Sequence, residues 1–497
     1  MARRLVWLFI LVAVARIVST YWTLNHTIDE PFFIGCGLEW LEDRRYTYMP
    51  EQPPLSHITA AIGAKLAGAR NVSPADFASK APLILYDSPS YWRTLASARA
   101  GELPFFVLAA LAVWLWARRL HGERVALAAV LLFTTLPVVL GHAGLATTDI
   151  AICAMLPAAL YAFVVWVDEP GVRQALWLAA AVAGGVLSKF SFLLYFPVCV
   201  MVLLLLRGRW KFSRRHLVTL VPAVLASVAV ICAVYRFDLG PLWQGLKDVK
   251  DHNDYGHLSY LFGERRITGW WYFFPVVFAY KTPLAFLALI ALSCFWLKRE
   301  SWGPLGCGIA VLIAAMPSHI NIGVRHILPI FPLLAIPAGF AAVRLMESAS
   351  WMQRGLAGCL ILWQLAASAR AHPDYFAYFN ELAHGKPELI RVDSDLDWGQ
   401  AYEELASRLR SRGIKETVSI CGFGCVIPAR HGLVDAVLVE PWNPATGWVA
   451  ISATERYLSD RRPPDGVSTK PWAWLDRYEP TERIAGGAML LYYIPRN

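Results

Sequence analysis

Charged residues are scarce in this sequence, and their scarcity argues against a soluble fold. Asp, Glu, Lys and Arg make up 17% of its 497 residues, whereas a soluble globular protein has about 25%. Hydrophobic residues make up 57%, and the mean hydropathy is +0.43. The composition therefore indicates a helical membrane protein that crosses the bilayer several times.

The cysteines supply neither a zinc site nor a clear disulfide framework. A structural zinc ion takes four ligands, and Cys36, Cys421 and Cys425 are the only cysteines outside apolar runs. The pair Cys421 and Cys425 is compatible with a disulfide if that part of the chain lies outside the cytoplasm, or with two free thiols, because the short spacing demands a favourable geometry. The remaining six are typical of small core residues: Cys153, Cys199, Cys232, Cys294, Cys307 and Cys359.

Internal repeats and low-complexity tracts are also missing from the sequence. Transporters are often built from inverted repeats, so a transporter is the less favoured class of membrane protein. No A-x-A-like cleavage site follows the first apolar run, from Leu5 to Trp22. That run therefore predicts a retained helix and not a signal peptide.

The formal net charge of +9 is explained better by membrane topology than by nucleic-acid binding. Apolar runs of about 20 residues span a bilayer, and arginines before the first run favour a cytoplasmic N-terminus. We predict about eleven transmembrane helices, near residues 5–22, 101–117, 124–141, 148–167, 174–190, 191–206, 217–235, 272–296, 303–318, 326–343 and 355–371. Every predicted inner loop is then basic: Arg118, Arg119, Arg124, Arg173, Arg207, Arg209, Lys211, Arg214, Arg215, Lys298, Arg299, Arg344 and Arg354.

Three longer segments fall on the predicted outer side, which gives a division into residues 1–371 and 372–497. The first, 23–100, contains an amphipathic stretch at 54–69 that is typical of a helix lying on the membrane surface. The second, 236–271, ends in an aromatic belt before the eighth span. In the third, 372–497, the sequence pattern predicts a helix over 400–412 and strands over 417–421, 434–439, 448–452 and 488–494. Helices mixed with strands indicate a small extracytoplasmic α/β domain.

Carboxylates occur at two predicted span ends on the outer side. Asp29 and Glu30 follow the first span, and Asp149 opens the fourth. Such carboxylates can accept a proton from a hydroxyl or hold a divalent ion. The alternative is helix capping, since acidic residues before a helix are ordinary N-cap chemistry.

Basic residues occur at the same predicted level of the membrane. Arg99 precedes the second span, Lys189 follows the fifth, and Arg325 and His326 open the tenth. Lys281 lies about eight residues inside the eighth span, which is deep for a snorkelling side chain. Carboxylates and cations together favour a transfer reaction with a phosphate leaving group, and Arg and Lys both bind phosphates. A transporter or a lipid-binding protein without catalysis remains the alternative.

The motifs along the chain resemble the integral-membrane glycosyltransferases of the C-type (GT-C) fold grouped as family 39, which include protein O-mannosyltransferases and lipid A aminoarabinose transferases. The resemblance is carried, in order, by Asp29-Glu30, Pro53-Pro54-Leu55, Arg99, Thr148-Asp149, Lys189, Gly269-Trp270-Trp271, Lys281-Thr282-Pro283, Arg325-His326 with Leu328-Pro329, and the segment 393–400, which is similar to bacterial members of unknown acceptor. The aminoarabinose transferases carry a lysine before Pro-Pro-Leu where this chain has Gln52.

The resemblance implies a sugar transfer from a polyprenyl-phosphate carrier to a lipid, glycan or protein hydroxyl on the outer face of the inner membrane, with inversion. Asp29 would be the general base, Glu30 would support it, and Asp149 would orient Asp29 or the acceptor. Arg99, Lys189, Lys281, Arg325 and His326 would hold the carrier phosphate. No cofactor would be required, although a divalent ion between the carboxylates remains an alternative. Asp393, Asp395 and Asp397 resemble part of a calcium loop, but the pattern favours a polar turn.

Overall fold

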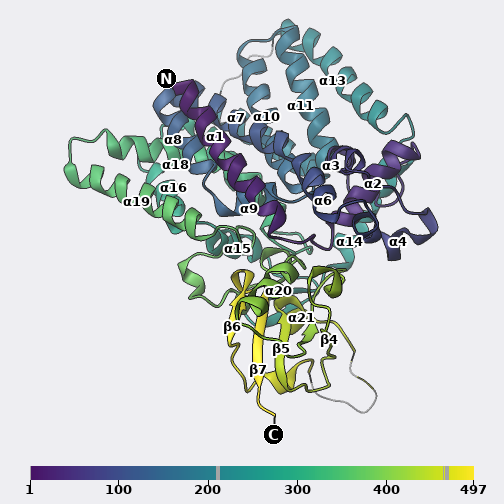
Figure 1. Cartoon of the computed structure of the whole chain (residues 1–497). Coiled ribbons are helices and arrows are strands. Elements are labelled where there is room, and N and C mark those ends of the chain that lie inside the picture. Colours follow the sequence, from purple (N-terminus) through teal and green to yellow (C-terminus); the bar gives the residue numbers. More distant parts are fainter. Residues whose placement is uncertain (1, 209–212, 463, 465–469, 497) are drawn as a thin grey trace.

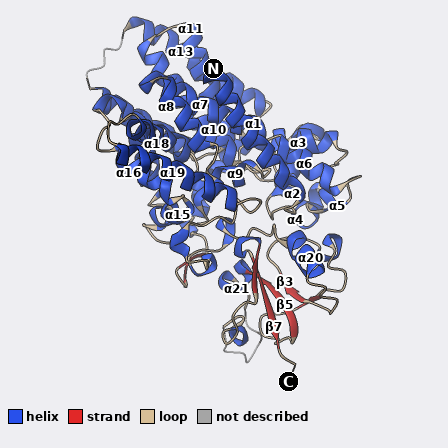
Figure 2. Ribbon diagram, turned by 60° about the vertical axis from the view of Figure 1, so that its left-hand side comes forward, coloured by secondary structure: helices blue, strands red, loops and turns tan. Residues whose placement is uncertain are grey.

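The computed structural model describes residues 2–208, 213–462, 464 and 470–496. A body of helices occupies the upper part of Figure 1, and a sheet with short helices lies below it, at the C-terminal end. Figure 2 shows the same separation of helices and strands from another side. Arg209 and Lys211, predicted to lie in an inner loop, fall outside the described residues.

Within the described residues, four helical stretches are long and apolar enough to cross a bilayer. They are Ala2–Trp22, Tyr91–His121, Asp149–Asp168 and Arg214–Val234. In the order of the chain they correspond to α1 (Ala2–Ser19) with a 3-10 turn, α6 (Tyr91–Ala100) with α7 (Leu103–His121), α10 (Asp149–Asp168) and α13 (Arg214–Val234). The structure thus shows a polytopic helical membrane protein.

Two predicted spans are each broken into a pair of helices. The helices α8 (Glu123–Phe133) and α9 (Pro137–Ala143) meet at 67°, and α15 (Phe273–Lys281) and α16 (Leu284–Ser293) meet at 112°. In both pairs the residue before a proline is extended: Leu136 before Pro137 and Thr282 before Pro283. Proline disfavours a helical conformation at the preceding residue, so the predicted spans 124–141 and 272–296 are each a bent pair of helices and not one continuous helix.

Shorter apolar helices fill the remaining predicted segments. They are α11 (Val172–Ser188), α12 (Phe192–Arg207), α17 (Gly303–Ala315) and α18 (Ile330–Met346). The last predicted segment lies within α19 (Trp351–Arg370), which has 20 residues. The predicted break at Lys189 is confirmed, because α11 ends at Ser188 and α12 begins at Phe192. The number of crossings remains a prediction.

The centre of the helical body is α18, which is apolar on nearly all sides and almost wholly buried. It packs against α7, α8, α16, α17 and α19. A helix that is hydrophobic all round belongs in a core. By contrast, α13 exposes Leu217, Val221, Val224 and Leu225, which is the surface that a lipid-facing helix presents.

The first long loop forms a compact helical layer. It contains α2 (Glu30–Glu42), α3 (Leu55–Leu66), α4 (Phe77–Lys80) and α5 (Leu83–Tyr86), and it leads into α6. Helices α2 and α3 approach closely at Gly37, where a Cβ would lie 1.9 Å from the His57 carbonyl oxygen. Helix α3 occupies the predicted surface helix, and it buries one face against α2 and α6 while Leu66 is exposed.

The second long loop contains α14 (Gly240–Tyr255) and a hairpin of β1 (Ser259–Leu261) and β2 (Glu264–Arg266). The C-terminal part has a five-stranded sheet in the order β4-β3-β5-β7-β6. Its strands are β3 (Ser419–Cys421), β4 (Val437–Leu438), β5 (Gly447–Ser452), β6 (Glu482–Ile484) and β7 (Met489–Ile494). The pairs of β3 are parallel and the pairs of β7 are antiparallel.

Two helices accompany this sheet: α20 (Tyr402–Ser411), which packs on one face through Leu405 and Leu409, and α21 (Ala453–Leu458). Four strands were predicted, and β6 and the β1–β2 hairpin were not, since three residues are too few to show an alternating pattern. All nine cysteines are free thiols. Cys421 contacts Arg461 and Cys425 contacts His26, so the structure does not contain the alternative disulfide.

Candidate active site

The carboxylate of Asp29 lies at the start of α2 without capping it. Asp29 occupies the N-cap position and makes no side-chain capping hydrogen bond. Its Oδ2 atom instead accepts a hydrogen bond from Arg325 Nη1 at 3.1 Å. The Asp29 side chain is 28% exposed and that of Arg325 13%. Asp29 therefore combines a cationic partner with access to solvent.

Arg325 enters the site from a 3-10 turn, Val324–Ile327, that precedes α18. Its guanidinium lies over the ring of Trp398, with Cζ 4.4 Å from the ring centroid. Its Nε atom is buried and has no hydrogen-bond partner among the described residues. A guanidinium with an unused, buried N–H donor is suited to bind an anion, because Arg binds phosphate through more than one N–H.

A second ion pair joins Asp149 to Lys189. Asp149 is the first residue of α10, and Lys189 is the C-cap of α11. Lys189 Nζ donates to Asp149 Oδ1 at 2.7 Å, and Thr147 Oγ1 donates to Oδ2 at 3.1 Å. His142 Nδ1 lies 3.7 Å from the same Oδ2 atom. The lysine is thus directed toward Asp149 and does not extend freely to the membrane surface.

The two ion pairs lie close enough to act on each other. Burial raises the pKa of Asp29, Arg325 lowers it, and the charges of Asp149 and Asp393 raise it, so the pKa lies above its ordinary value. A carboxylate with a raised pKa is a stronger base. His326 lies in the same 3-10 turn as Arg325, with its ring centroid 6.1 Å from that of Phe274.

Glu30 and Arg99 form a separate, fully buried pair. Both side chains are 0% exposed. Arg99 donates from Nε and Nη2 to Glu30 and from its terminal nitrogens to the carbonyl oxygens of Tyr21, Leu24 and Asn25. These contacts match the five N–H donors of a guanidinium. The Arg99 guanidinium is therefore fully engaged with protein groups in this structure.

Both carboxylate oxygens of Glu30 also have protein hydrogen-bond donors. Its oxygens also accept hydrogen bonds from the backbone N–H groups of Thr27 and Ala146, each at 2.9 Å. Burial acts to raise the pKa of Glu30, but Arg99 and these two N–H groups lower it to a net value below the ordinary one. Glu30 fixes the loop before Asp29 and does not face the open side of the site.

Lys281 lies at the sharp bend between α15 and α16. Its Nζ atom donates to the carbonyl oxygens of Phe376 and Asp395, at 2.8 and 2.5 Å. The side chain is buried. Lys281 thus lies at a bend and not inside a continuous helix, because Pro283 ends α15, and its Nζ atom contacts two backbone carbonyls of the C-terminal segment.

The segment 393–400 forms part of the site, which the sequence indicated only as a polar turn. The backbone carbonyl of Trp398 accepts the N–H of Ile28 at 3.0 Å, next to Asp29. Trp398 stacks on Phe376, with ring centroids 5.6 Å apart. One residue thus contacts both the loop that carries Asp29 and the guanidinium of Arg325. The only sign of this role in the sequence was a tryptophan next to three alternating aspartates. The sequence does not show which cation lies over its ring.

The three alternating aspartates of this segment are internal and do not form a calcium loop. Asp395 accepts the N–H of Val324, Asp397 accepts the N–H groups of Gly399 and Thr454, and Arg391 pairs with Asp393 and Asp395. Among the described residues, no group of three or more His, Cys, Asp or Glu side chains has the arrangement to hold a metal ion. The oxygens of Glu30 are already occupied, so Asp29, Glu30 and Asp149 do not fit a shared divalent ion.

Gln52 approaches this site from the first loop, at the position where the sequence departs from the aminoarabinose transferases. Thr148 Oγ1 lies 3.5 Å from Gln52 Oε1, and Thr148 directly precedes Asp149. The departure thus occurs beside a candidate catalytic carboxylate.

The comparisons with known proteins identify the fold. Residues 94–235 match the family model described as dolichyl-phosphate-mannose-protein mannosyltransferase. This match contains Arg99, Asp149 and Lys189. No curated protein matches the sequence significantly.

Three solved structures are similar to most or nearly all of the chain. ArnT from Cupriavidus metallidurans bound to undecaprenyl phosphate has a TM-score of 0.54 and 16% identity, with 77% of this chain and 72% of that chain covered. The apo state of the same protein gives a TM-score of 0.51 and 13% identity over 99% of each chain. The apo oligosaccharyltransferase of Archaeoglobus fulgidus gives 0.50 and 12%, over 88% of this chain and 64% of that one. The chain has a GT-C fold and resembles the family 39 glycosyltransferases.

Proposed function

We propose that the protein is an inverting glycosyltransferase that moves a sugar from a polyprenyl-phosphate carrier to the hydroxyl group of an acceptor. The observation that carries this proposal is the contact between Asp29, an accessible carboxylate, and Arg325, a cation whose Nε–H has no partner in the described part of the chain. A base for the acceptor and a binding group for the phosphate lie side by side. The similarity to undecaprenyl-phosphate-bound ArnT supports the class of donor.

In the proposed mechanism Asp29 takes the proton of the acceptor hydroxyl. The hydroxyl oxygen then attacks the anomeric carbon of the sugar, and the bond from that carbon to the phosphate oxygen breaks. The electron pair of that bond leaves with the carrier phosphate, where Arg325 and Lys189 neutralise the developing charge. A single displacement of this kind inverts the anomeric carbon. These steps use side chains that the structure brings together.

The remaining residues take positioning roles in the proposal. Glu30 and Arg99 hold the loop that carries Asp29, and Lys281 fastens the C-terminal segment through Phe376 and Asp395. Asp149 directs Lys189, and His326 belongs to the turn that carries Arg325. Arg99 and Lys281 are therefore no longer assigned to the carrier phosphate.

A transfer assay with purified protein tests this function. The protein is supplied with a labelled polyprenyl-phosphate sugar and with an extract of membrane lipids, glycans and envelope proteins as acceptors. Transfer, or slow hydrolysis of the donor by water, supports an enzyme. Binding of the carrier without turnover under any acceptor condition would instead favour the non-catalytic alternative, and movement of the donor across a vesicle membrane would favour a transporter.

The Lys189→Met variant is expected to bind polyprenyl phosphate on the order of tenfold more weakly and to lose turnover as well, because a charge-assisted contact to the leaving group is lost. Methionine keeps the apolar stem, and Asp149 retains Thr147 and His142 as neighbours. Carrier affinity and kcat are measured separately. The matched control is Lys80→Met, which removes an exposed lysine of the first loop. Parental affinity in Lys189→Met would remove Lys189 from the phosphate site.

Arg325 is expected to affect both binding and the pH dependence of transfer. Arg325 lowers the pKa of Asp29, and the base works only when it is ionised. Activity is therefore lost as the pH falls through the Asp29 pKa, and Arg325→Met should shift this acid limb to higher pH. Arg325→Lys should restore the position of the limb but only part of the affinity, because lysine does not make the bidentate contact. An unmoved limb in Arg325→Met would separate Arg325 from Asp29.

We also propose that the N-terminus is cytoplasmic, that the first long loop, Asp29 and the C-terminal α/β part lie outside the cytoplasm, and that the membrane is the inner membrane. The basic predicted inner loops support this orientation. A reporter that is active only outside the cytoplasm, fused to the C-terminus, should be active, and the same reporter placed after α7 should be silent. The reverse pattern would place the site on the cytoplasmic face.

A further inference from the structure

Asn25 is a buried amide between the first long loop and the C-terminal part of the chain. The residue is 0% exposed. Its Oδ1 atom accepts the backbone N–H groups of Tyr402 at 2.8 Å and Glu403 at 3.4 Å. Its Nδ2 atom donates to the carbonyl oxygens of Gly399 at 2.7 Å and His26 at 2.9 Å. An amide side chain has two lone pairs and two N–H donors, so the protein uses all four.

The acceptor half of this amide caps α20 from outside the helix. The first N–H groups of an α-helix have no partner within it, and the side chain of the preceding residue usually accepts one of them. For α20 that residue is Ala401, whose side chain has no polar atom. Asn25, which lies 377 positions earlier in the sequence, supplies the missing oxygen.

The donor half of the amide holds the loop next to the proposed base. Its partner Gly399 follows Trp398, whose carbonyl accepts the N–H of Ile28 at 3.0 Å. Asp29 is the next residue of the loop, and Arg325, its cationic partner, lies over the ring of the same Trp398. These contacts therefore fix the place of the carboxylate relative to the guanidinium.

We propose that Asn25 is a positioning residue for sugar transfer, through which the C-terminal α/β part holds Asp29 in place. The inference rests on the proposed role of Asp29 as the general base. A helix cap alone needs only an acceptor, which Ser or Asp provides as well as Asn. An amide is needed where the same side chain must also donate. Here both donated hydrogen bonds end within two residues of the contact between Ile28 and Trp398.

Two substitutions separate the helix cap from the hold on the loop. Asn25→Ala removes both halves of the amide. Asn25→Asp keeps an acceptor for α20 but places a carboxylate oxygen next to the carbonyls of Gly399 and His26. Both should lower kcat on the order of tenfold, because a small displacement of a reacting group costs rate. The affinity for polyprenyl phosphate should not change, since the proposed phosphate-binding cations belong to other elements. Parental kcat in Asn25→Asp would show a plain helix cap and overturn the proposal.

The matched control is Asn380→Ala, which removes another buried amide. Asn380 is 3% exposed. It donates to the carbonyl oxygens of Ala279 and Thr282 and accepts the N–H of Leu382. This variant should lose stability while it keeps parental kcat per folded molecule. A loss of kcat equal to that of Asn25→Ala would show that any broken amide contact has this effect, and would contradict the proposal.

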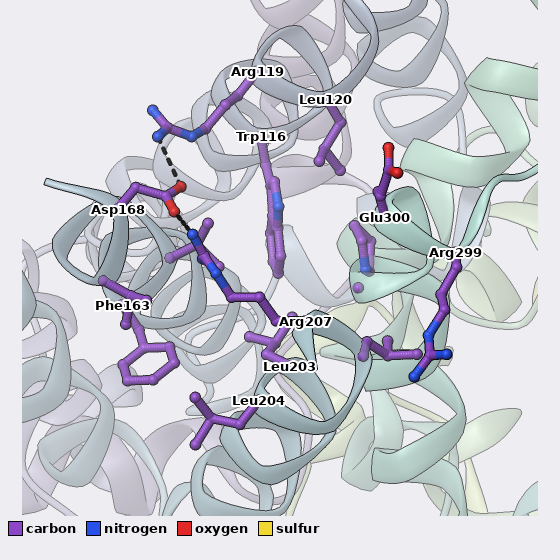
Figure 3. A pocket seen from close by; sticks show the side chains of 15 residues that line it. Trp116, Arg119, Leu120, Phe163, Asp168, Leu203, Leu204, Arg207, Arg299 and Glu300 are labelled. Atoms are coloured by element: carbon purple, nitrogen blue, oxygen red, sulfur yellow. Dashed lines mark hydrogen bonds and ion pairs between the residues drawn. The ribbon is translucent and has the colours of Figure 1, made fainter. Parts of the chain in front are cut away.

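A distant control lies at the opposite end of α10. Asp168 ends this helix beside a cavity of about 410 Å³, where it pairs with Arg119 and Arg207 (Figure 3). A helix of this length spans about 30 Å, which separates the cavity from the start of α10 at Asp149. Asp168→Asn should therefore leave kcat unchanged, and an effect as large as that of Asn25→Ala would count against a specific role of Asn25.

A double variant tests whether Asn25 acts through Asp29. In the Asp29→Asn background, Asn25→Ala should lower kcat no further, because residues that act as a unit have non-additive effects. An equal loss in both backgrounds would show that Asn25 acts elsewhere, and would overturn the positioning role. Near-parental turnover in Asp29→Asn alone would remove the proposed base and this inference with it, whereas a slow Asp29→Asn with parental Asn25 variants would remove only this inference.

Hydrogen exchange of the full chain in detergent gives a second readout that needs no sugar donor. The N–H of Ile28 is bonded to the Trp398 carbonyl, and it should exchange faster once the loop opens more often. Peptides covering residues 24–30 are therefore expected to exchange faster in Asn25→Ala and Asn25→Asp than in the parent and in both controls. Unchanged exchange of these peptides in the two Asn25 variants would overturn the proposal, even if kcat fell.

Discussion

The Asp29→Asn variant is expected to transfer sugar roughly 10²-fold or more slowly than the parent at saturating donor, the size of effect of a lost general base. Asparagine keeps the shape of the side chain and can still contact Arg325, but it does not accept the hydroxyl proton. Carrier binding should change little, because Arg325 and Lys189 remain. The measurements are kcat from single-turnover transfer and the affinity for polyprenyl phosphate.

The control for this variant is Asp87→Asn, at an exposed aspartate of the same loop, which should behave like the parent. Equal thermal stability of both variants shows that the loss of rate is chemical. Near-parental turnover in Asp29→Asn would exclude Asp29 as the base. Asp149, which lies beside Lys189, would then be the next candidate for the general base.

The Glu30→Gln variant is expected to lower the free energy of unfolding by about 3–5 kcal/mol, the range for a broken buried ion pair. Arg99 would remain buried with its charge unbalanced, next to the carbonyl oxygens of Tyr21, Leu24 and Asn25. The effect is measured as a drop in the thermal unfolding midpoint in detergent, with and without polyprenyl phosphate. Turnover per folded molecule should fall less than in Asp29→Asn.

A double variant separates the ion pair from the shape of the site. Replacing both partners, as Glu30→Met with Arg99→Met, removes the unpaired charge and is expected to be more stable than either single replacement. A Glu30→Gln protein as stable as the parent would contradict the structural role. Loss of carrier binding in Arg99→Met at unchanged stability would return Arg99 to the phosphate site.

Adjacent carboxylates take different roles here because of helix geometry. Successive helical residues are separated by 100° around the axis, since a turn has about 3.6 residues. At the start of α2, Glu30 points into the buried layer beneath α6, where Arg99 lies, and Asp29 remains on the side of Arg325. The sequence showed a pair of acids at a span end. It did not show that Glu30 would be buried in an ion pair with Arg99.

Local features of the chain were readable from the sequence because their causes are local. Apolar runs predicted the helical segments, and alternating residues predicted four strands of the C-terminal sheet. The break in the eighth span was not predicted, although its cause, Pro283 after Thr282, is local as well. The acids at the ends of spans one and four, and the cations Lys189 and Arg325, were found because a charge next to an apolar run stands out.

Which charge meets which was decided only by the tertiary structure. Arg325 pairs with Asp29, which is 296 residues away in the sequence, and Arg99 pairs with Glu30. Trp398, which contacts Arg325, belongs to a segment that the sequence indicated only as a polar turn. An ion pair between distant residues produces no periodic pattern in the sequence. The sequence also does not distinguish an arginine whose five donors contact protein from one that is available to a phosphate. Only the packing of the helices brings these donors and acceptors within reach, and so fixes which cation remains available for a substrate.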